Sequence, residues 1–337
     1  MSKVIVWLVF VLSATSAVAQ SGDRITVMTY NVENFFDDID DPRYPNDRET
    51  LNDTAYVSGK AASIARVINR FDNGKGPDVL VLTEIESQVA LSALKDALSS
   101  PSDYKTEVFF DADPNRPGPK PDFRGIDVAI LARLPLAPGT APKPHVIDLT
   151  GESACIEDDG SPGSTRDAIE ASFELPGGET LSVFGVHFPS GGNPIVCREI
   201  AAKTVRDLAN DLPSDHTVLL AGDFNFNCRD DEQVALNRIF AGWALPVQLD
   251  NGCVGNGSHW FSRENTWSYL DVIAERPQAS PWRTEMRTFR LVINDFEQLF
   301  FQDSIKRLRP KKFRLNTSNP ANSGTSDHFP VAVDLVK

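Results

Sequence analysis

The sequence predicts a layered α/β fold built around one hydrophobic core. Short apolar runs recur along the chain, and they are rich in Val, Ile and Leu, as buried strands are. Amphipathic segments with apolar residues at helical spacing lie between these runs. Because strands alternate with helices and no repeat or linker interrupts them, we expect packed layers of both. The length of 337 residues, of which 41% are hydrophobic, suffices for such a domain.

The expected elements follow from these patterns in chain order. A first helix is expected from Ser58, as its N-cap, to about Arg70. Two further helices are expected over Val89–Leu98 and Arg198–Ala209, because each collects its apolar residues on one face. The expected strands are Ile25–Tyr30, Val79–Leu82, Val128–Leu131, Leu181–Val186, Thr217–Ala221, Tyr269–Ile273 and Val331–Leu335.

The N-terminus has the order of a secretory signal peptide. Lys3 is followed by the apolar run Val4–Leu12 and then by Ala17-Val18-Ala19, a small-residue cleavage pattern. The apolar run is shorter than the ~20 residues that a membrane-spanning helix needs. We therefore expect a signal peptide over residues 1–19, one mature domain over residues 20–337, and secretion to the periplasm or medium without stable membrane insertion.

The cysteines suit an oxidising compartment. The chain has four of them, and none lies at the C-x-x-C spacing of a metal site. They predict two disulfides, for which three pairings are possible. The favoured pairs are Cys155–Cys197 and Cys228–Cys253, the second tying the loop after Asn225 to the loop before the next motif.

The net charge of -14 argues against binding of a polyanion by a generally basic surface. One segment before Asp327 is an exception, because cations crowd it. Two interpretations stay open: a solvated loop, or a wall that contacts phosphate beside the site. The residues are Lys306, Arg307, Arg309, Lys311, Lys312 and Arg314.

Polar groups stand where expected strands end or begin. Thr217–Ala221 leads directly into Gly222-Asp223-Phe224-Asn225, and Ser326-Asp327-His328 stands just before the last strand. Such groups are costly to bury without partners, so their recurrence at strand ends indicates one shared site. Asp271 lies inside an apolar strand and therefore needs a partner, for which His328 is the natural choice.

The donor types favour a hard metal ion. Carboxylate and amide oxygens hold Mg²⁺ or Ca²⁺, whereas the scattered His and the Cys spacing do not fit zinc. A second Ser-Asp-His, at Ser214-Asp215-His216, opens the strand that Asp223 closes. Its distance from that edge, ~20 Å at ~3.3 Å per residue, predicts an ordinary turn.

In order and spacing, six motifs resemble those of the endonuclease/exonuclease/phosphatase superfamily, in particular secreted bacterial hydrolases whose first motif reads YNVEN. The resemblance covers about residues 24–337 and implies a four-layer α/β/β/α sandwich, with two mixed, mostly antiparallel sheets flanked by helices. The motifs are Tyr30-Asn31-Val32-Glu33-Asn34, Thr83-Glu84, Arg124-Gly125-Ile126-Asp127, His187-Phe188-Pro189-Ser190, Gly222-Asp223-Phe224-Asn225 and Ser326-Asp327-His328.

The resemblance also implies a role for each site residue. Asp223 would activate water, and Asn225 would hold that water or the phosphate. His187 and His328 would contact the scissile phosphate, with Asp271 orienting His328. The remaining roles would be metal binding by Asn31, Glu33, Glu84 and Asp327, and a phosphate contact by Arg124.

We therefore expect a secreted, Mg²⁺-dependent phosphodiesterase, with Mn²⁺ or Ca²⁺ as possible substitutes for Mg²⁺. The expected substrate is DNA or RNA, and the expected form is a monomer. Three alternatives stay open: a phospholipid headgroup phosphodiesterase of the sphingomyelinase kind, a sugar or inositol phosphatase, and a catalytically silent secreted binding protein. Absence of a site residue would mark the last, and the sequence has all of them.

Overall fold

The structure is a computed structural model that describes residues 24–44, 53–155, 165–227, 230–245, 257–295, 299–302 and 308–337. The expected signal peptide, Cys228 and Cys253 lie outside these ranges, as do Lys306 and Arg307. Within them the α-helices are α1 (Thr54–Asn69), α2 (Gln88–Ala97), α3 (Ile195–Asn210) and α4 (Asp230–Ile239).

The strands of the described ranges form two large sheets and two small hairpins. The strands are β1 (Arg24–Phe35), β2 (Val79–Ile85), β3 (Thr106–Phe109), β4 (Asp127–Ala132), β5 (Lys143–His145), β6 (Ala168–Glu174), β7 (Thr180–His187), β8 (Thr217–Asp223), β9 (His259–Phe261), β10 (Thr266–Ser268), β11 (Asp271–Glu275), β12 (Arg283–Leu291), β13 (Phe300–Gln302), β14 (Leu308–Pro310) and β15 (Val331–Val336).

Both large sheets are mixed and mostly antiparallel, as expected. The first has six strands in the order β12-β15-β1-β2-β4-β3, and only β1 and β2 run parallel in it. The second has five strands in the order β11-β8-β7-β6-β5, and only β7 and β8 run parallel in it. β9 and β10 pair as one hairpin and β13 and β14 as the other.

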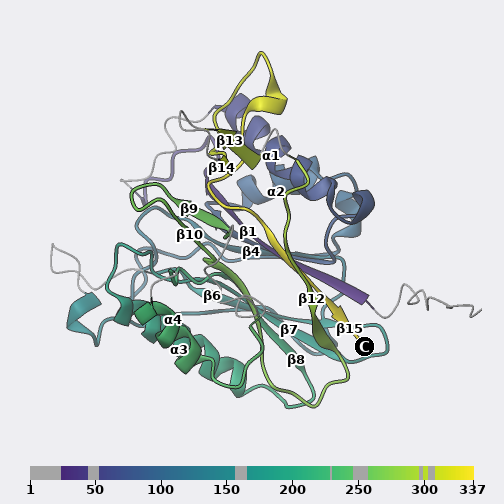
Figure 1. The fold of residues 1–337 in the computed structure, drawn as a ribbon, viewed down its shortest axis with the longest axis vertical. Coiled ribbons are helices and arrows are strands. Elements are labelled where there is room, and N and C mark those ends of the chain that lie inside the picture. The colour runs from purple at the N-terminus through teal and green to yellow at the C-terminus, as the bar shows by residue number, and fades with distance from the viewer. Residues whose placement is uncertain are drawn as a thin grey trace, which may run out of the picture.

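The molecule has four layers. In Figure 1, α1 and α2 lie above the sheets, and α3 and α4 lie at the lower left. The apolar faces of α1 and α2 pack on the first sheet, and those of α3 and α4 pack on the second. A third apolar cluster fills the space between the sheets, and it contains Val81 of the first sheet and Val183 of the second. The expected α/β/β/α sandwich is confirmed.

Some element boundaries differ from the expectation. The first helix begins at Thr54, not at Ser58, because the side chain of Asp53 caps it by accepting a hydrogen bond from the Tyr56 N–H. Ser58 instead donates its hydroxyl to the Thr54 carbonyl within the helix. Asp271 is the first residue of β11 and not an interior one, so its side chain lies at the sheet edge.

The topology brings the polar strand ends to one edge. The parallel pair β1 and β2 carries Asn31 and Glu84 near its carboxyl ends, and the parallel pair β7 and β8 ends at His187 and Asp223. β11 runs antiparallel to β8, so its first residue pairs with Asp223. β15 runs antiparallel to β1, so the residues before it reach the same edge.

One of the two expected disulfides lies in the described ranges. Cys155 and Cys197 are bonded, with 5.7 Å between their Cα atoms, which fastens the segment before residue 156 to α3. In the described part of the chain, no helix has the length and apolar character needed to cross a membrane.

Candidate active site

Two carboxylates and one amide form the centre of the site. The Asn31 amide nitrogen donates to Asp223 Oδ2 at 2.9 Å and to Glu84 Oε1 at 3.3 Å. The Asn34 N–H donates to the other Glu84 oxygen at 2.7 Å. Glu33, Asn34 and Glu84 all have positive φ, so the backbone leaves both strands in left-handed conformations that turn these residues to the edge.

Asp271 and His328 form a buried pair. His328 Nδ1 lies 2.7 Å from Asp271 Oδ2, as the apolar surroundings of Asp271 predicted. Burial alone would lower the pKa of His328, but the negative charge of Asp271, and then those of Asp223 and Asp327, raise it to about 10. His328 is therefore an imidazolium at neutral pH, with Nδ1 donating to Asp271 and Nε2 at 3.9 Å from Asp223 Oδ2.

Asp223 is suited to accept a proton near neutral pH. Burial, together with the nearby charges of Asp271 and Glu84, raises its pKa to about 7, although His328 and Asn31 oppose this rise. Its Oδ1 accepts a hydrogen bond from the Asn225 N–H, which closes a tight turn. The amide of Asn225 donates to the Phe188 carbonyl at 3.0 Å, which ties this turn to the end of β7.

His187 is a neutral imidazole. Burial, reinforced by the charges of Arg166 and Arg124, holds the pKa of His187 well below its ordinary value. Its Nε2 lies 3.6 Å from Asp223 Oδ2, so we assign the ring hydrogen to this nitrogen, because a lone pair there would face a carboxylate. Among the described residues, its buried Nδ1 has no hydrogen-bond partner.

Lys312 holds the remaining two predicted metal residues together. Its Nζ lies 2.7 Å from Glu33 Oε1 and 2.7 Å from Asp327 Oδ2. Lys60 is buried nearby and donates to the Thr325 carbonyl at 2.8 Å. Burial lowers the pKa of Lys60 to about 8, although Glu33 and Asp327 partly oppose this. Two lysines therefore compensate this acidic corner of the site.

Two arginines line the cavity on the side of His187, away from Lys312. The Arg124 guanidinium bonds to Asp122 at 3.1 Å and to Asn34 Oδ1 at 3.0 Å. The buried Arg166 makes an ion pair with the other Asp122 oxygen at 2.8 Å. Asp122 thus fixes two guanidinium groups beside His187, where they can face an anion.

All predicted site residues except Asp271 line one cavity of about 710 Å³, and Asp271 lies directly behind His328. The sequence did not single out Lys60, Arg166, Asp122 or His259 for the site. Lys60 carried a signal, since it shares the spacing of Val57 and Ile64 on the buried face of α1. His259 packs on His328 with 4.7 Å between ring centres, a contact that only the tertiary fold reveals.

The residues suit a hard divalent metal ion. Glu84 and Asp327 offer carboxylate oxygens at the cavity surface, with the Asn31 amide beside them. Atoms of Asp223, Asp271 and His328 also lie within 4.8 Å of one another. Asp271 Oδ2 in this group already accepts a hydrogen bond from the charged His328. The metal roles of Asn31, Glu33, Glu84 and Asp327 stay predictions.

Comparison with known families agrees with this geometry. A model of the Endonuclease/Exonuclease/phosphatase family matches residues 26–337. The chain belongs to this family. It is therefore a metal-dependent phosphoric ester hydrolase. No curated protein matches the sequence.

Solved structures share the fold at low identity. A humanized TDP2 of D. rerio with 14 mutations has a TM-score of 0.59 at 16% identity, with 93% of this chain and 99% of that chain covered. Sphingomyelinase C from Streptomyces griseocarneus has a TM-score of 0.57 at 16% identity, with 92% and 99% covered. A D. rerio TDP2 complex with a single strand DNA product has a TM-score of 0.56 at 15% identity, with 93% and 99% covered.

Proposed function

We propose that the protein is a secreted, Mg²⁺-dependent phosphodiesterase that hydrolyses nucleic acid as a monomer. The observation that carries the proposal is one cavity in which a charged His328, an Asp223 of raised pKa and the carboxylates of Glu84 and Asp327 meet. Secretion rests on the sequence of residues 1–19. Two observations support a nucleic acid substrate. A protein with this fold has been solved with single strand DNA, and a cationic surface adjoins the cavity, formed by Arg309, Lys311, Lys312 and Arg314.

The arrangement assigns one task to each side chain. Asp223 Oδ2 accepts the proton of the attacking water, for which a pKa of about 7 is well matched. His328 donates from Nε2 to the phosphoryl or leaving oxygen, and Asp271 keeps it charged and oriented. Neutral His187 donates from Nε2 to a second phosphoryl oxygen. Arg124 and Arg166, on the His187 side of the cavity, balance the negative charge of the phosphoryl group.

A divalent ion would be held chiefly by Glu84 and Asp327. Lys312 already contacts Asp327 Oδ2, which leaves Oδ1 for the metal. When bound, the ion neutralises charge on the phosphoryl oxygens.

A substrate panel tests the proposal. Purified residues 20–337 are assayed with Mg²⁺ and with EDTA on plasmid DNA, RNA, sphingomyelin and inositol phosphates. We expect hydrolysis of DNA or RNA with Mg²⁺ only, and its loss in Asp223→Ala, with a thermal unfolding curve like that of the wild type. Activity that survives EDTA, or a fully active Asp223→Ala, would refute the assignment.

A phospholipid headgroup is the second candidate substrate, and one observation favours it. Phe301 on β13 and Leu308 on β14 are 42% and 44% exposed. Their hairpin contacts β9 through β14, and His259 and Phe261 of β9 line the cavity. Exposed apolar side chains beside cations can dock on a membrane surface. Sphingomyelin hydrolysis in the panel, without hydrolysis of nucleic acid, would decide for this candidate.

A further inference from the structure

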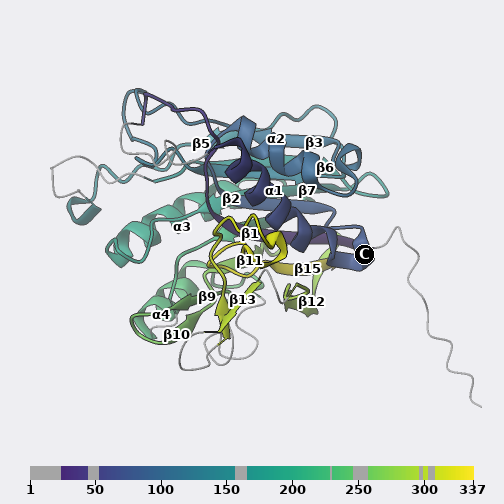
Figure 2. The same cartoon turned by 90° about the horizontal axis from the view of Figure 1, so that it is seen from above.

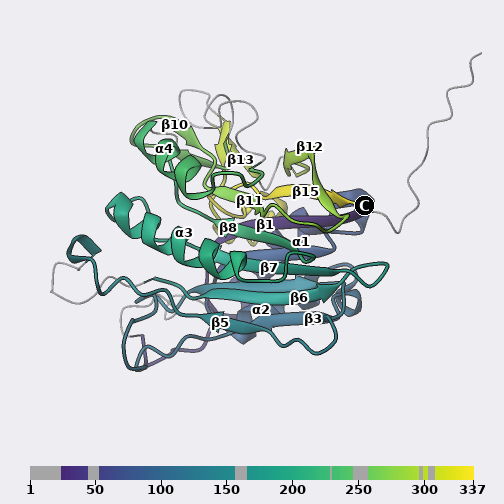
Figure 3. The same cartoon turned by 90° about the horizontal axis from the view of Figure 1, so that it is seen from below.

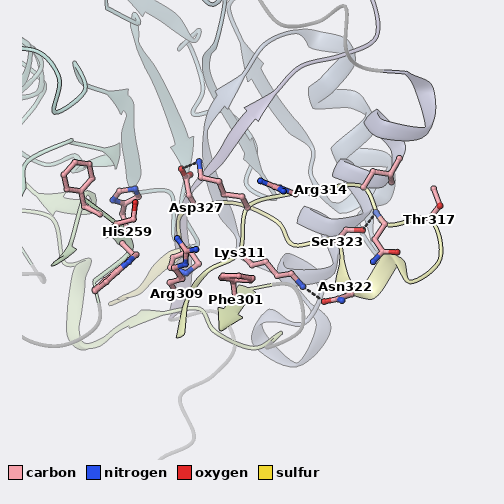
Figure 4. A pocket seen from close by; sticks show the side chains of 16 residues that line it. His259, Phe301, Arg309, Lys311, Arg314, Thr317, Asn322, Ser323 and Asp327 are labelled. Atoms are coloured by element: carbon pink, nitrogen blue, oxygen red, sulfur yellow. Dashed lines mark hydrogen bonds and ion pairs between the residues drawn. The ribbon is translucent and has the colours of Figure 1, made fainter. Parts of the chain in front are cut away.

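A second groove adjoins the catalytic cavity. It is formed by β9, β14 and residues 311–323, and its volume is about 690 Å³. Figure 4 shows His259 and Asp327 at one end and Thr317 and Asn322 at the other. Because His259, Phe261 and Asp327 line both spaces, the groove begins where the catalytic cavity ends. Figure 2 labels β9, β10 and β13 on one side of the molecule, and Figure 3 again shows β10 and β13 on a common side.

The groove is cationic although the protein is acidic. Arg309, Lys311, Lys312 and Arg314 line it, and Asp327 is the sole carboxylate among the described lining residues. The chain as a whole carries a net charge of -14. A concentration of positive charge against that background selects for an anionic ligand.

Within the described ranges, Arg309 and Arg314 of this surface form no ion pair with a carboxylate. The Arg309 Nε is buried without a hydrogen-bond partner there. Among the same residues no carboxylate lies at ion-pair distance from Arg314, whereas Arg116 forms a close pair with Asp167 elsewhere. Lys311 reaches across the groove to the neutral Asn322. A buried donor without an acceptor, such as the Arg309 Nε, is costly, and a phosphate oxygen would satisfy it.

Aromatic rings stand among these cations. Phe301 is 42% exposed, and the Arg309 guanidinium lies over its ring at 4.8 Å from the centre. Trp260 and Phe261 of β9 line the end nearest the cavity. Aromatic rings beside cations can stack on the bases of a single strand, which are exposed. The bases of a duplex are already stacked on one another and face inward, so they are not available to these rings.

We propose that this basic groove binds the single-stranded stretch of polynucleotide next to the scissile phosphodiester. The inference rests on the proposed function and extends it, because it makes an extended single strand the preferred substrate over a small ester or a duplex. The phosphates lie against Lys311 and Arg314, and an unpaired base stacks near Phe301. The scissile phosphodiester itself binds in the catalytic cavity and not in the groove.

The test compares an oligonucleotide with a small diester that reaches the catalytic cavity only. Lys311→Gln/Arg314→Gln is assayed on single strands of about 12 nucleotides, as DNA and as RNA, and on bis(p-nitrophenyl) phosphate. The matched control is Lys203→Gln/Arg287→Gln, which removes the same charge from exposed positions outside both spaces. Oligonucleotide affinity is measured separately by fluorescence anisotropy with the metal chelated.

We expect the groove variant to raise the KM and the dissociation constant of the oligonucleotide about tenfold or more, with kcat/KM for the small diester within about twofold of wild type. The slope of log affinity against log salt should fall by about 0.7 for each phosphate that the variant no longer neutralises. Phe301→Leu should weaken oligonucleotide binding about fivefold or more, because it removes the stacking ring. The control variant should behave as wild type.

Other outcomes overturn the inference. Equal reductions of activity on both substrates would mean that the substitutions disturb the catalytic cavity, and unchanged oligonucleotide binding would mean that the groove holds no strand. Loss of binding to phosphatidylserine vesicles, with oligonucleotide binding intact, would assign the surface to lipid. If wild type hydrolyses neither substrate with Mg²⁺, the proposed function fails, while anisotropy still tests the groove.

Discussion

At the scale of single residues, the site is organised by buried charges that compensate one another. Asp271 is fully buried, and its 2.7 Å bond to His328 offsets the cost of burying a carboxylate. The same bond fixes the ring of His328 and keeps it charged. The other ring nitrogen, Nε2, lies 3.9 Å from Asp223 Oδ2, and both residues line the cavity.

Replacing Asp271 by Asn should change the pH dependence of the reaction as well as its rate. Asp271, together with Asp223 and Asp327, raises the pKa of His328 to about 10, so the proposed acid stays protonated up to that pH. In Asp271→Asn the pKa of His328 should fall, so the decline of activity on the alkaline side of the pH profile should begin at a lower pH. We expect kcat at pH 7 to fall about 10²-fold or more, measured with its pH profile. An alkaline limb that stays near pH 10 would contradict this role.

Lys60 should make stability depend on pH in the alkaline range. Burial lowers its pKa from 10.5 to about 8, so between these values the unfolded chain binds the extra proton and the folded chain does not. The free energy of unfolding should therefore rise with pH across this window, by roughly 3 kcal/mol from this group.

Lys60→Met should lack this rise, which urea unfolding of both proteins at several pH values between 8 and 10.5 would show. Parallel curves for wild type and Lys60→Met would mean that Lys60 titrates normally in the folded protein. The comparison within one buffer series removes the contribution of groups that both proteins share.

The site residues at strand ends were predictable, and those that arrive from distant loops were not. Asp223 and His328 stand at strand ends, where polar groups next to apolar runs are visible in the sequence. Arg166 adjoins no apolar run in the sequence, and its ion pair with Asp122 holds it at the site. The sequence does not show this ion pair.

At the scale of elements, the close approach of β7 and β8 places His187 beside Asp223. Gly222 has φ of +152°, and a Cβ built there would lie 1.8 Å from the Val186 carbonyl oxygen. No side chain is compatible with that distance, so the glycine lets the strand end turn Asp223 toward the site.

Gly222→Ala should therefore be severely destabilising. We expect a loss of about 3 kcal/mol or more in the free energy of unfolding, because the clash is with backbone and no side chain can move to relieve it. Gly151→Ala is the matched control, since nothing lies within 4 Å of its added Cβ. Urea unfolding of both variants checks this, and similar stability for the two would show that the β8 backbone adapts.

The sequence predicted which segments are helices or strands more accurately than it predicted where they begin and end. Every expected strand is present, because Val, Ile and Leu runs are buried in the sheets. α1 starts earlier than expected, since Asp53 competes successfully with Ser58 as a cap. β6 and β12 are the longest of the described strands that were not expected: polar residues interrupt their apolar character, and their pairing partners stabilise them.

At the scale of the whole molecule, the sandwich explains why two copies of one tripeptide differ in role. Ser326-Asp327-His328 precedes β15 at the site, whereas Ser214-Asp215-His216 forms a turn before β8, at the other end from Asp223. His216 Nδ1 lies 3.1 Å from the Ser182 hydroxyl, and it lines neither the cavity nor the groove. The position in the sheet, and not the local sequence, places one copy at the cavity and the other away from it.

The two tripeptides provide the most direct test of the account. The rate of phosphodiester hydrolysis with Mg²⁺ is measured for His328→Gln and for His216→Gln, with thermal unfolding as a check on folding. If His328 is the acid of the reaction, His328→Gln should lose about 10²–10⁴-fold in kcat. His216→Gln should stay within about twofold of wild type. A folded His328→Gln that remains as active as His216→Gln would contradict the account.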